Sequence, residues 1–299
     1  MQNWIDIHYT SRDGLRLYAR HYPVSGSQRR PVVCLAGLTR NSRDFHDLAS
    51  VLSRQDETGR DVFCLDYRGR GRSQHDPNWK NYSILVELND TLDFMAMKGL
   101  DRAGVIGTSR GGLITMLMGA LRPNALGAAV LNDIGPVIER EGLARIVAYV
   151  GRVPLPANWQ EATQLIYEMN RRQFTAVHQD EWPDIARQIF NDDNGLPAPS
   201  YDPQLAKAIS MMDGDTPELW PQFTALAHVP LLAIRGENSD ILKQRTVVEM
   251  QARHPRFTAV TVRGQGHAPL LKDAPTINAI AGFLAQTDGD AHASVRAVA

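Results

Sequence analysis

The sequence predicts a protein of the α/β class, in which helices cover both faces of a mixed sheet. Three observations predict this class: short apolar runs alternate with helical patterns, most of these runs lack polar alternation, and a hairpin signal stands near the start. A continuous apolar run indicates a strand that is buried on both faces. Strands that alternate with helices are typical of parallel strands joined by helical crossovers.

The first two expected strands form an antiparallel pair. Trp4–Tyr9 and Leu15–Tyr22 flank Asp13-Gly14, a dipeptide typical of hairpin turns. Compact apolar runs then predict further strands at Pro31–Ala36, Asp61–Asp66, Ala103–Gly107, Ala128–Asn132, Pro230–Arg235 and Arg256–Val262. We expect these later strands to be mostly parallel, because a helical pattern separates most neighbours.

Helical periodicity fills the gaps, at Arg43–Arg54, Ser83–Gly99, Gly111–Leu121, Leu242–Arg253 and Pro275–Ala285. Residues 135–226 break the alternation, because they contain no convincing strand and are interrupted by Pro and Gly. We expect residues 135–226 to form a helical lid over one end of the sheet, where such folds place their substrates. Residues 1–134 and 227–286 then form the core, and residues 287–299 a disordered tail.

Composition excludes several classes of function. The 299 residues carry 32 Lys and Arg against 33 Asp and Glu, which provides no electrostatic footprint for nucleic acid or an anionic membrane. No apolar run approaches the roughly 18 residues of a membrane span, and the first residues do not resemble a signal peptide. Cys34 and Cys64 lie in apolar runs and are expected to be reduced thiols. We therefore expect a cytoplasmic protein.

The most informative motif is Gly107-Thr108-Ser109-Arg110-Gly111, which joins an apolar strand to an apolar helix. A serine hydroxyl is a weak nucleophile unless it is held exposed beside a base. A tight strand-to-helix turn can hold it so, provided that the flanking glycines let the two elements pass without a Cβ clash. The N-terminus of the helix also offers unpaired N–H groups to an oxyanion.

This turn resembles the nucleophile elbow of the α/β-hydrolase superfamily. The resemblance runs from about Ile5 to Leu284, with the expected lid in the family's lid position. It implies an eight-stranded, mostly parallel sheet with helices on both faces, and Ser109 as the nucleophile. The run Asp66–Ser73 similarly resembles the family's D-x-R-G-x-G-x-S turn, a scaffold in which we expect Arg68 to bond loop carbonyls.

The resemblance also implies an acid and a histidine that follow the serine in the chain. His267 stands in a glycine-containing loop after the last strand and is the expected base. Two carboxylates are candidates for the acid. We favour Asp240, just beyond the strand that follows the lid, over Asp133, which ends the strand before the lid. The other interpretation of Asp133 is that it only organises a turn before Gly135-Pro136.

Two backbone N–H groups are expected to form the oxyanion hole, those of Arg110 and Leu38. The family usually has His-Gly before the second donor, whereas this chain has Ala36-Gly37, which puts the geometry of that loop in doubt. The Arg110 side chain has two interpretations that the sequence leaves even. It recognises a carboxylate or carbonyl of the substrate, or it pairs with a nearby acidic residue and holds the loop together.

These residues predict a serine hydrolase that cleaves a carboxylic ester or lactone of a small to medium organic substrate. The alternatives are an acyltransferase, a carbon–carbon bond hydrolase with the same triad, and a ligand-binding protein without turnover. No cofactor and no metal is expected, because phosphate-binding and zinc-ligand patterns are missing. The expected partner is a small molecule, and a homo-oligomer is left open. Either of two roles is open for four apolar residues, which line an acyl pocket or form the core of the lid: Met211, Met212, Trp220 and Phe223.

Overall fold

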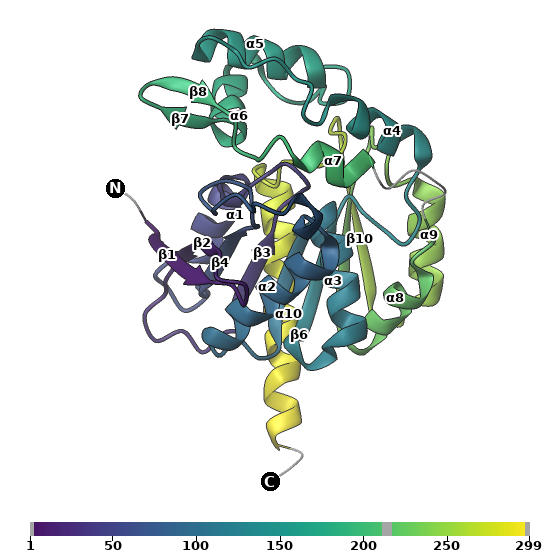
Figure 1. Ribbon diagram of the computed structural model, residues 1–299. Coiled ribbons are helices and arrows are strands. Elements are labelled where there is room, and N and C mark those ends of the chain that lie inside the picture. The colour runs from purple at the N-terminus through teal and green to yellow at the C-terminus, as the bar shows by residue number, and fades with distance from the viewer. Residues whose placement is uncertain (1–2, 211–216, 297–299) are drawn as a thin grey trace.

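The computed structural model describes residues 3–210 and 217–296, with side chains as far as Asp288. Its main sheet has eight strands and is mostly parallel, which confirms the predicted class (Figure 1). Only β1 with β2 and β2 with β4 pair antiparallel. In order across the sheet, the strands are β1 (Ile5–Thr10), β2 (Arg16–Tyr22), β4 (Val62–Asp66), β3 (Val32–Leu35), β5 (Ala103–Thr108), β6 (Leu126–Asn132), β9 (Leu231–Gly236) and β10 (Phe257–Val262).

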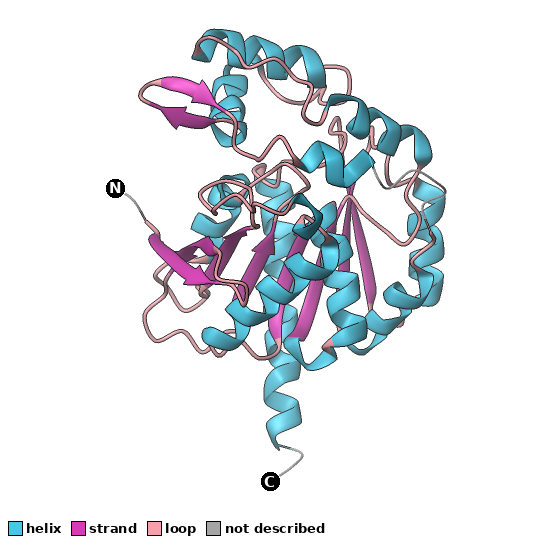
Figure 2. Cartoon of the chain, viewed as in Figure 1, coloured by secondary structure: helices cyan, strands magenta, loops and turns pink. Residues whose placement is uncertain are grey.

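Helices cover both faces of this sheet, as Figure 2 shows. Two of them, α1 (His46–Leu52) and α10 (Ala274–Arg296), pack on one face. Four pack on the other face: α2 (Ile84–Met97), α3 (Arg110–Leu121), α8 (Trp220–Thr224) and α9 (Gln244–Arg253). The central strands are therefore apolar on both sides, which is why their sequences do not alternate.

Strand β3 illustrates how one short run serves both faces. Val33 and Leu35 enter the cluster that contains α2 and α3, whereas Val32 and Cys34 enter the cluster that contains α1 and α10. Cys34 lies beside Cys64 of β4, and both are buried free thiols. Burial raises the pKa of the Cys34 thiol well above its ordinary value. These cysteines thus act as small apolar residues of the core.

Residues 135–210, which follow β6, lie over the end of the sheet at which the parallel strands terminate (Figure 1). Residues 135–210 contain four α-helices and pack partly around a cluster of their own, whereas α8 follows them in the chain and packs on the sheet. Those helices are α4 (Arg140–Tyr149), α5 (Trp159–Asn170), α6 (Trp182–Ile189) and α7 (Leu205–Ser210). The expectation of no strand here was wrong, because β7 (Asn191–Asp193) pairs with β8 (Leu196–Ala198). The turn Asn194-Gly195 has positive φ at both residues, a hairpin signal whose flanking strands are too short to show alternation.

The C-terminal helix is longer than the sequence predicted. α10 ends at Arg296, so it extends over residues 287–296, where the sequence led us to expect a disordered tail. Asp288 anchors the helix beyond its apolar part, because its carboxylate pairs with Arg60 at 2.8 Å and with Arg29 at 3.1 Å. Arg60 is buried, so this contact joins α10 to the body of the molecule rather than to solvent.

Candidate active site

Ser109 stands on a strained turn between β5 and α3. Its φ is 51°, in the left-handed region that non-glycine residues rarely adopt. The turn needs the two flanking glycines: a Cβ on Gly107 would lie 2.4 Å from the Gly111 backbone, and a Cβ on Gly111 would lie 2.1 Å from the Leu35 carbonyl oxygen. The close packing of strand and helix therefore depends on G-x-S-x-G.

His267 follows β10 and meets the serine. Its Nε2 lies 2.9 Å from Ser109 Oγ, and its Nδ1 lies 2.7 Å from Asp133 Oδ2. The carboxylate accepts the hydrogen bond of Nδ1, which leaves Nε2 to accept the hydroxyl proton. The His267 side chain is 7% exposed and that of Asp133 is fully buried. Three groups from three strand ends thus form one continuous hydrogen-bonded relay.

Asp133 directly follows β6 and is well supplied with donors. Besides His267, its carboxylate accepts the Gly236 N–H at 2.7 Å and the Ser239 hydroxyl at 2.6 Å. Both of these donors lie at the end of β9, the neighbouring strand. These hydrogen bonds fix the position of the buried carboxylate beside His267. Asp133 therefore does more than organise a turn.

The preference for Asp240 as the acid is corrected by the structure. The Asp240 carboxylate meets Arg145 of α4, with Nε at 2.6 Å and Nη2 at 3.0 Å, rather than His267. Burial works to raise the pKa of Asp240, but Arg145 holds that pKa below its ordinary value. Since β6 and β9 are neighbours, both acids lie near the same edge of the sheet, and sequence order alone does not distinguish them.

The two expected oxyanion donors lie on either side of the serine turn. Arg110 is the first residue of α3, and Leu38, in the loop after β3, lines the same cavity as Ser109. Among the hydrogen bonds of the described residues, none is donated by the backbone N–H of Leu38 or Arg110. Both groups are therefore available to a ligand. The Leu38 carbonyl accepts a hydrogen bond from Arg70 Nε at 3.0 Å.

The Arg110 side chain turns away from this cavity. Its Nε lies 2.5 Å from Glu87 Oε2, and its Nη2 donates to the Tyr82 carbonyl at 3.1 Å. The side chain is 7% exposed. Of the two interpretations open at the sequence level, the structure supports pairing with an acid rather than recognition of a substrate.

Arg68 was expected to bond loop carbonyls, and this prediction was wrong. Its guanidinium pairs with three carboxylates, at 2.7 Å from Asp13, 2.5 Å from Asp76 and 2.8 Å from Asp90. Arg68 is fully buried, and hydrogen bonds to neutral carbonyl groups alone would not neutralise its positive charge. Arg68 therefore joins this turn to three acidic residues instead of to carbonyls.

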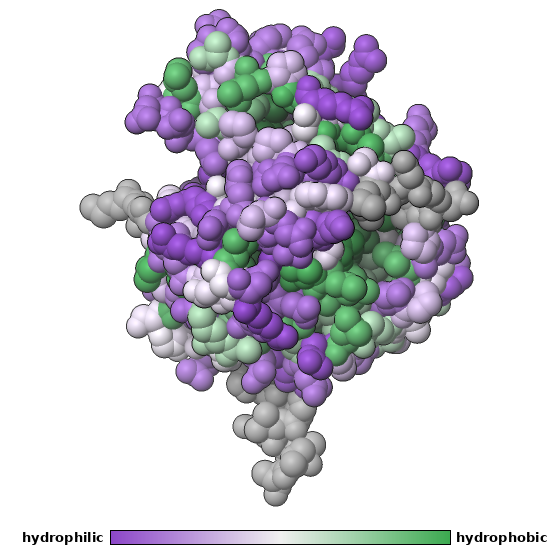
Figure 3. All heavy atoms as spheres, in the orientation of Figure 1, coloured by the Kyte–Doolittle hydropathy of each residue, from purple (hydrophilic) through white to green (hydrophobic). Residues whose placement is uncertain are grey.

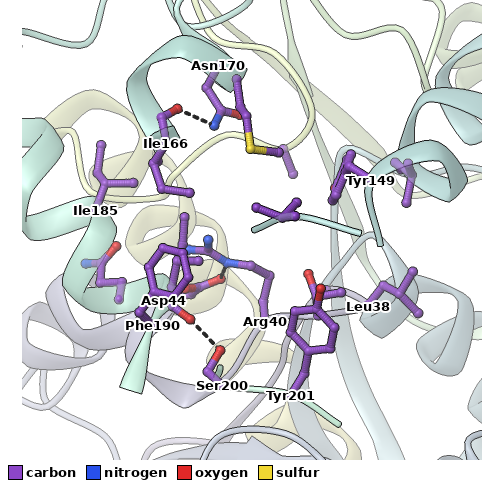
Figure 4. Close-up of a pocket in the computed structure, with 18 of the residues that line it drawn as sticks. Leu38, Arg40, Asp44, Tyr149, Ile166, Asn170, Ile185, Phe190, Ser200 and Tyr201 are labelled. Atoms are coloured by element: carbon purple, nitrogen blue, oxygen red, sulfur yellow. Dashed lines mark hydrogen bonds and ion pairs between the residues drawn. The ribbon is translucent and has the colours of Figure 1, made fainter. Parts of the chain in front are cut away.

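A cavity of about 360 Å³ opens above Ser109 and His267. Figure 4 shows its mainly apolar lining, in which Ile166, Ile185 and Phe190 come from the segment between β6 and β9. Leu155 and Met169 also line it and are exposed. On the face seen in Figure 3, hydrophobic residues gather on this upper segment among hydrophilic ones. The site can therefore receive an organic substrate with a sizeable apolar part.

Two arginines line the cavity, and each is paired with an acid. Arg40 binds Asp44 through two hydrogen bonds, at 2.6 and 2.7 Å, and Arg145 binds Asp240. Of the four residues considered for the acyl pocket, Trp220 and Phe223 pack against the sheet core in α8 instead of lining the cavity. Met211 and Met212 lie outside the described residues.

No group of three or more His, Cys, Asp or Glu in the described part of the chain is arranged to hold a metal ion. Among the helices in that part, none is both long and apolar enough to cross a membrane.

Comparison with known proteins places the chain in a family. The profile of the alpha/beta hydrolase fold matches residues 30–274, so the chain belongs to this family of hydrolases. A 3-hydroxybutyrate-oligomer hydrolase from Cupriavidus necator is 31% identical over 276 residues, 88% of this chain and 91% of that protein.

Solved structures agree with this assignment. An alpha/beta hydrolase from Novosphingobium aromaticivorans is 40% identical, with a TM-score of 0.88 over 95% of this chain and 99% of that one. E-2-(Acetamidomethylene)succinate hydrolase, 20% identical, shares the fold with a TM-score of 0.77 over 94% of this chain and 99% of that one.

Proposed function

We propose that this member of the α/β-hydrolase family is a serine hydrolase that cleaves a carboxylic ester or lactone through an acyl-enzyme on Ser109. The observation that carries the proposal is the continuous relay from Ser109 through His267 to Asp133, at the floor of a largely apolar cavity. A nucleophile, a base in hydrogen-bond reach and a carboxylate that orients the base are the parts that acyl transfer requires.

In the first half-reaction, Ser109 Oγ attacks the carbonyl carbon while His267 Nε2 takes its proton. The carbonyl oxygen becomes an oxyanion that accepts hydrogen bonds from the Leu38 and Arg110 N–H groups. Asp133 stabilises the imidazolium that forms. The tetrahedral intermediate then expels the alcohol, which receives the proton from His267, and the acyl group stays on Ser109.

In the second half-reaction, water enters and His267 takes one of its protons as the oxygen attacks the acyl carbon. The bond from Ser109 Oγ to the acyl carbon breaks, and the proton on His267 returns to the serine. The products are a carboxylic acid and an alcohol. From a lactone they are joined in one hydroxy acid, because the leaving oxygen is tethered to the acyl chain.

The cavity favours a substrate that is uncharged near the reacting carbonyl. Its two arginines are each neutralised by an acid, Arg40 by Asp44 and Arg145 by Asp240, so neither has a free charge for a substrate carboxylate. The volume of about 360 Å³ suits an ester with a sizeable apolar part, and the exposed side chains of Leu155 and Met169 belong to the lining. We propose that residues 135–210 of the expected lid cover this cavity, because α8, within the expected bounds 135–226, packs against the sheet instead.

The similarity to a 3-hydroxybutyrate-oligomer hydrolase directs the choice of natural substrate. Short oligoesters of hydroxy acids have uncharged internal esters separated by short apolar chains, which fits the lining described above. We propose them as the first natural substrates to examine.

The experiment compares the wild type with Ser109→Ala on p-nitrophenyl esters from acetate to octanoate and on 3-hydroxybutyrate dimers and trimers. Ser210→Ala, an exposed serine at the end of α7, controls for purification. We expect turnover by the wild type and the control, and a loss on the order of 10⁵-fold in Ser109→Ala. Equal turnover by Ser109→Ala would contradict the role of the serine. A wild type that releases product from none of these esters would contradict ester hydrolysis.

A further inference from the structure

A chain of buried charged side chains links the two residues that carry the oxyanion donors. Arg70, in the turn after β4, donates from Nε to the Leu38 carbonyl at 3.0 Å. Its Nη1 lies 2.8 Å from Oε1 of Glu87 in α2. The other oxygen of that carboxylate, Oε2, lies 2.5 Å from Arg110 Nε. One glutamate thus connects the loop after β3 with the start of α3.

The charges in this chain are fixed by burial. Arg70 and Glu87 are fully buried, and Arg110 is nearly so. Burial alone would raise the pKa of Glu87, but Arg110 and Arg70 hold that pKa below its ordinary value, so the carboxylate is ionised. The rings of Tyr67 and Tyr82 lie within 6 Å of the Arg70 guanidinium, at 5.8 and 5.3 Å. The cluster carries two cations and one anion beneath the serine turn.

Stability alone does not account for such a cluster. A buried ion pair is often no more stabilising than well-packed apolar side chains of the same volume, because both charges lose their hydration. What the pair provides is geometry, since planar guanidinium groups bind a carboxylate at defined angles. Here Arg110 is hydrogen-bonded to one oxygen of Glu87, and Arg70, whose Nη1 also donates to the Arg68 carbonyl at 2.7 Å, forms an ion pair with the other oxygen, so the carboxylate lies between the two guanidinium groups.

We propose that Glu87 and Arg70, together with the Arg110 side chain, are positioning residues for the oxyanion hole. Glu87 holds Arg110 at the start of α3 and, through Arg70, holds Leu38 by its carbonyl. This inference rests on the proposed function, because it requires both N–H groups to face the reacting carbonyl.

The network acts on the transition state and not on binding of the intact ester. The oxyanion exists only after the serine has attacked, so displaced donors lower kcat and leave KM nearly unchanged. A displacement of about 1 Å in a catalytic group can lower the rate about 100-fold. A purely structural pair would instead change stability without separating kcat from KM.

The test uses variants in two positions of the network and one matched control. Glu87→Gln removes the shared charge, and Arg110→Met leaves Arg70 and Glu87 as a balanced pair, which protects the fold. Asp90→Asn is the control, because Asp90 lies one turn further along α2 and binds Arg68 at 2.8 Å with both oxygens. The readouts are kcat and KM for a neutral ester, melting temperature, and affinity for an alkyl boronic acid, which forms a tetrahedral adduct with an active-site serine.

We expect Glu87→Gln and Arg110→Met to lower kcat and boronic acid affinity by about 100-fold each, with KM within about threefold of the wild type. Arg110→Lys restores part of the loss. Asp90→Asn lowers the melting temperature and retains kcat. If folded Arg110→Met retains kcat and boronic acid affinity, or if Asp90→Asn loses as much as Glu87→Gln, the proposal is overturned. A wild type without Ser109-dependent turnover would instead overturn the proposed function, and with it the premise of the network.

Discussion

The turns after β6 and β9 stand side by side at one edge of the sheet, and each carries a carboxylate. Asp133 comes directly after β6 and is buried against His267. Asp240 lies beyond the tight turn Gly236–Ser239 that follows β9, and pairs with Arg145 near the surface. The β9 turn still serves the relay, because Gly236 and Ser239 donate to Asp133. Of two neighbouring strand ends, one can therefore carry the carboxylate that contacts His267, and the other can carry the hydrogen-bond donors to that carboxylate.

The largest expected difference between the two turns is the effect on kcat of replacing their carboxylates. We expect Asp133→Asn to lower kcat about 10⁴-fold, because an amide opposite Nδ1 favours the wrong tautomer of His267. Asp240→Asn, which removes only a partly exposed ion pair, should change kcat by less than about fivefold. Both values come from the ester assay with melting temperatures measured in parallel. Equal losses in the two variants would show that the comparison is wrong.

Ser239→Ala sharpens the comparison, since it removes a donor to Asp133 from the β9 turn itself. The carboxylate keeps the Gly236 N–H and His267. Hydrogen bonds to charged groups are worth about 1.5–3 kcal/mol, so we expect kcat to fall by about tenfold or somewhat more. The ester assay measures kcat, and the melting temperature is measured in parallel. A kcat equal to that of Asp240→Asn would mean that this donor is irrelevant to the relay.

The Arg145→Met variant tests whether Asp240 could serve as the acid if Arg145 no longer bound it. In the wild-type background we expect KM to change by less than about fivefold, because the pair is partly exposed. In the Asp133→Asn background the freed Asp240 should recover no activity, since its place beyond the Gly236–Ser239 turn leaves it away from His267. Substantial recovery in the double variant would show that the β9 turn can supply the acid.

The smallest expected effect is that of Asp240→Asn on the free energy of unfolding. Arg145 holds the pKa of Asp240 below its ordinary value of 3.8 against the effect of burial, so the ion pair stabilises the fold above that pH. The contribution is lost as the pH falls below 3.8 toward the lowered pKa of the folded state. We expect Asp240→Asn to lose less than about 1 kcal/mol of unfolding free energy at pH 7. Urea unfolding at pH 7 and pH 2.5 measures this, and a difference that grows in acid would contradict it.

The contact between Ser109 and His267 was predictable because the signals of both residues are local. Gly107 and Gly111 permit the turn at Ser109 within a few residues of the chain, and His267 follows the last strand. The acid was not predictable, because the choice between Asp133 and Asp240 depends on which turn lies within reach of His267. The Arg110 side chain shows the same limit, since its partner Glu87 lies on a helix elsewhere in the chain. Contacts between segments that are distant in the chain produce no recognisable spacing of residues in the sequence.

The relay itself is tested most directly by covalent labelling with a short alkyl fluorophosphonate, which needs no knowledge of the natural substrate. Ser109 Oγ displaces fluoride, and peptide mapping by mass spectrometry locates the adduct. We expect one adduct, on Ser109, that forms rapidly in the wild type and in Asp240→Asn but orders of magnitude more slowly in Asp133→Asn. An adduct on another residue, or rapid labelling of Ser109 in Asp133→Asn together with slow labelling in Asp240→Asn, would contradict the account.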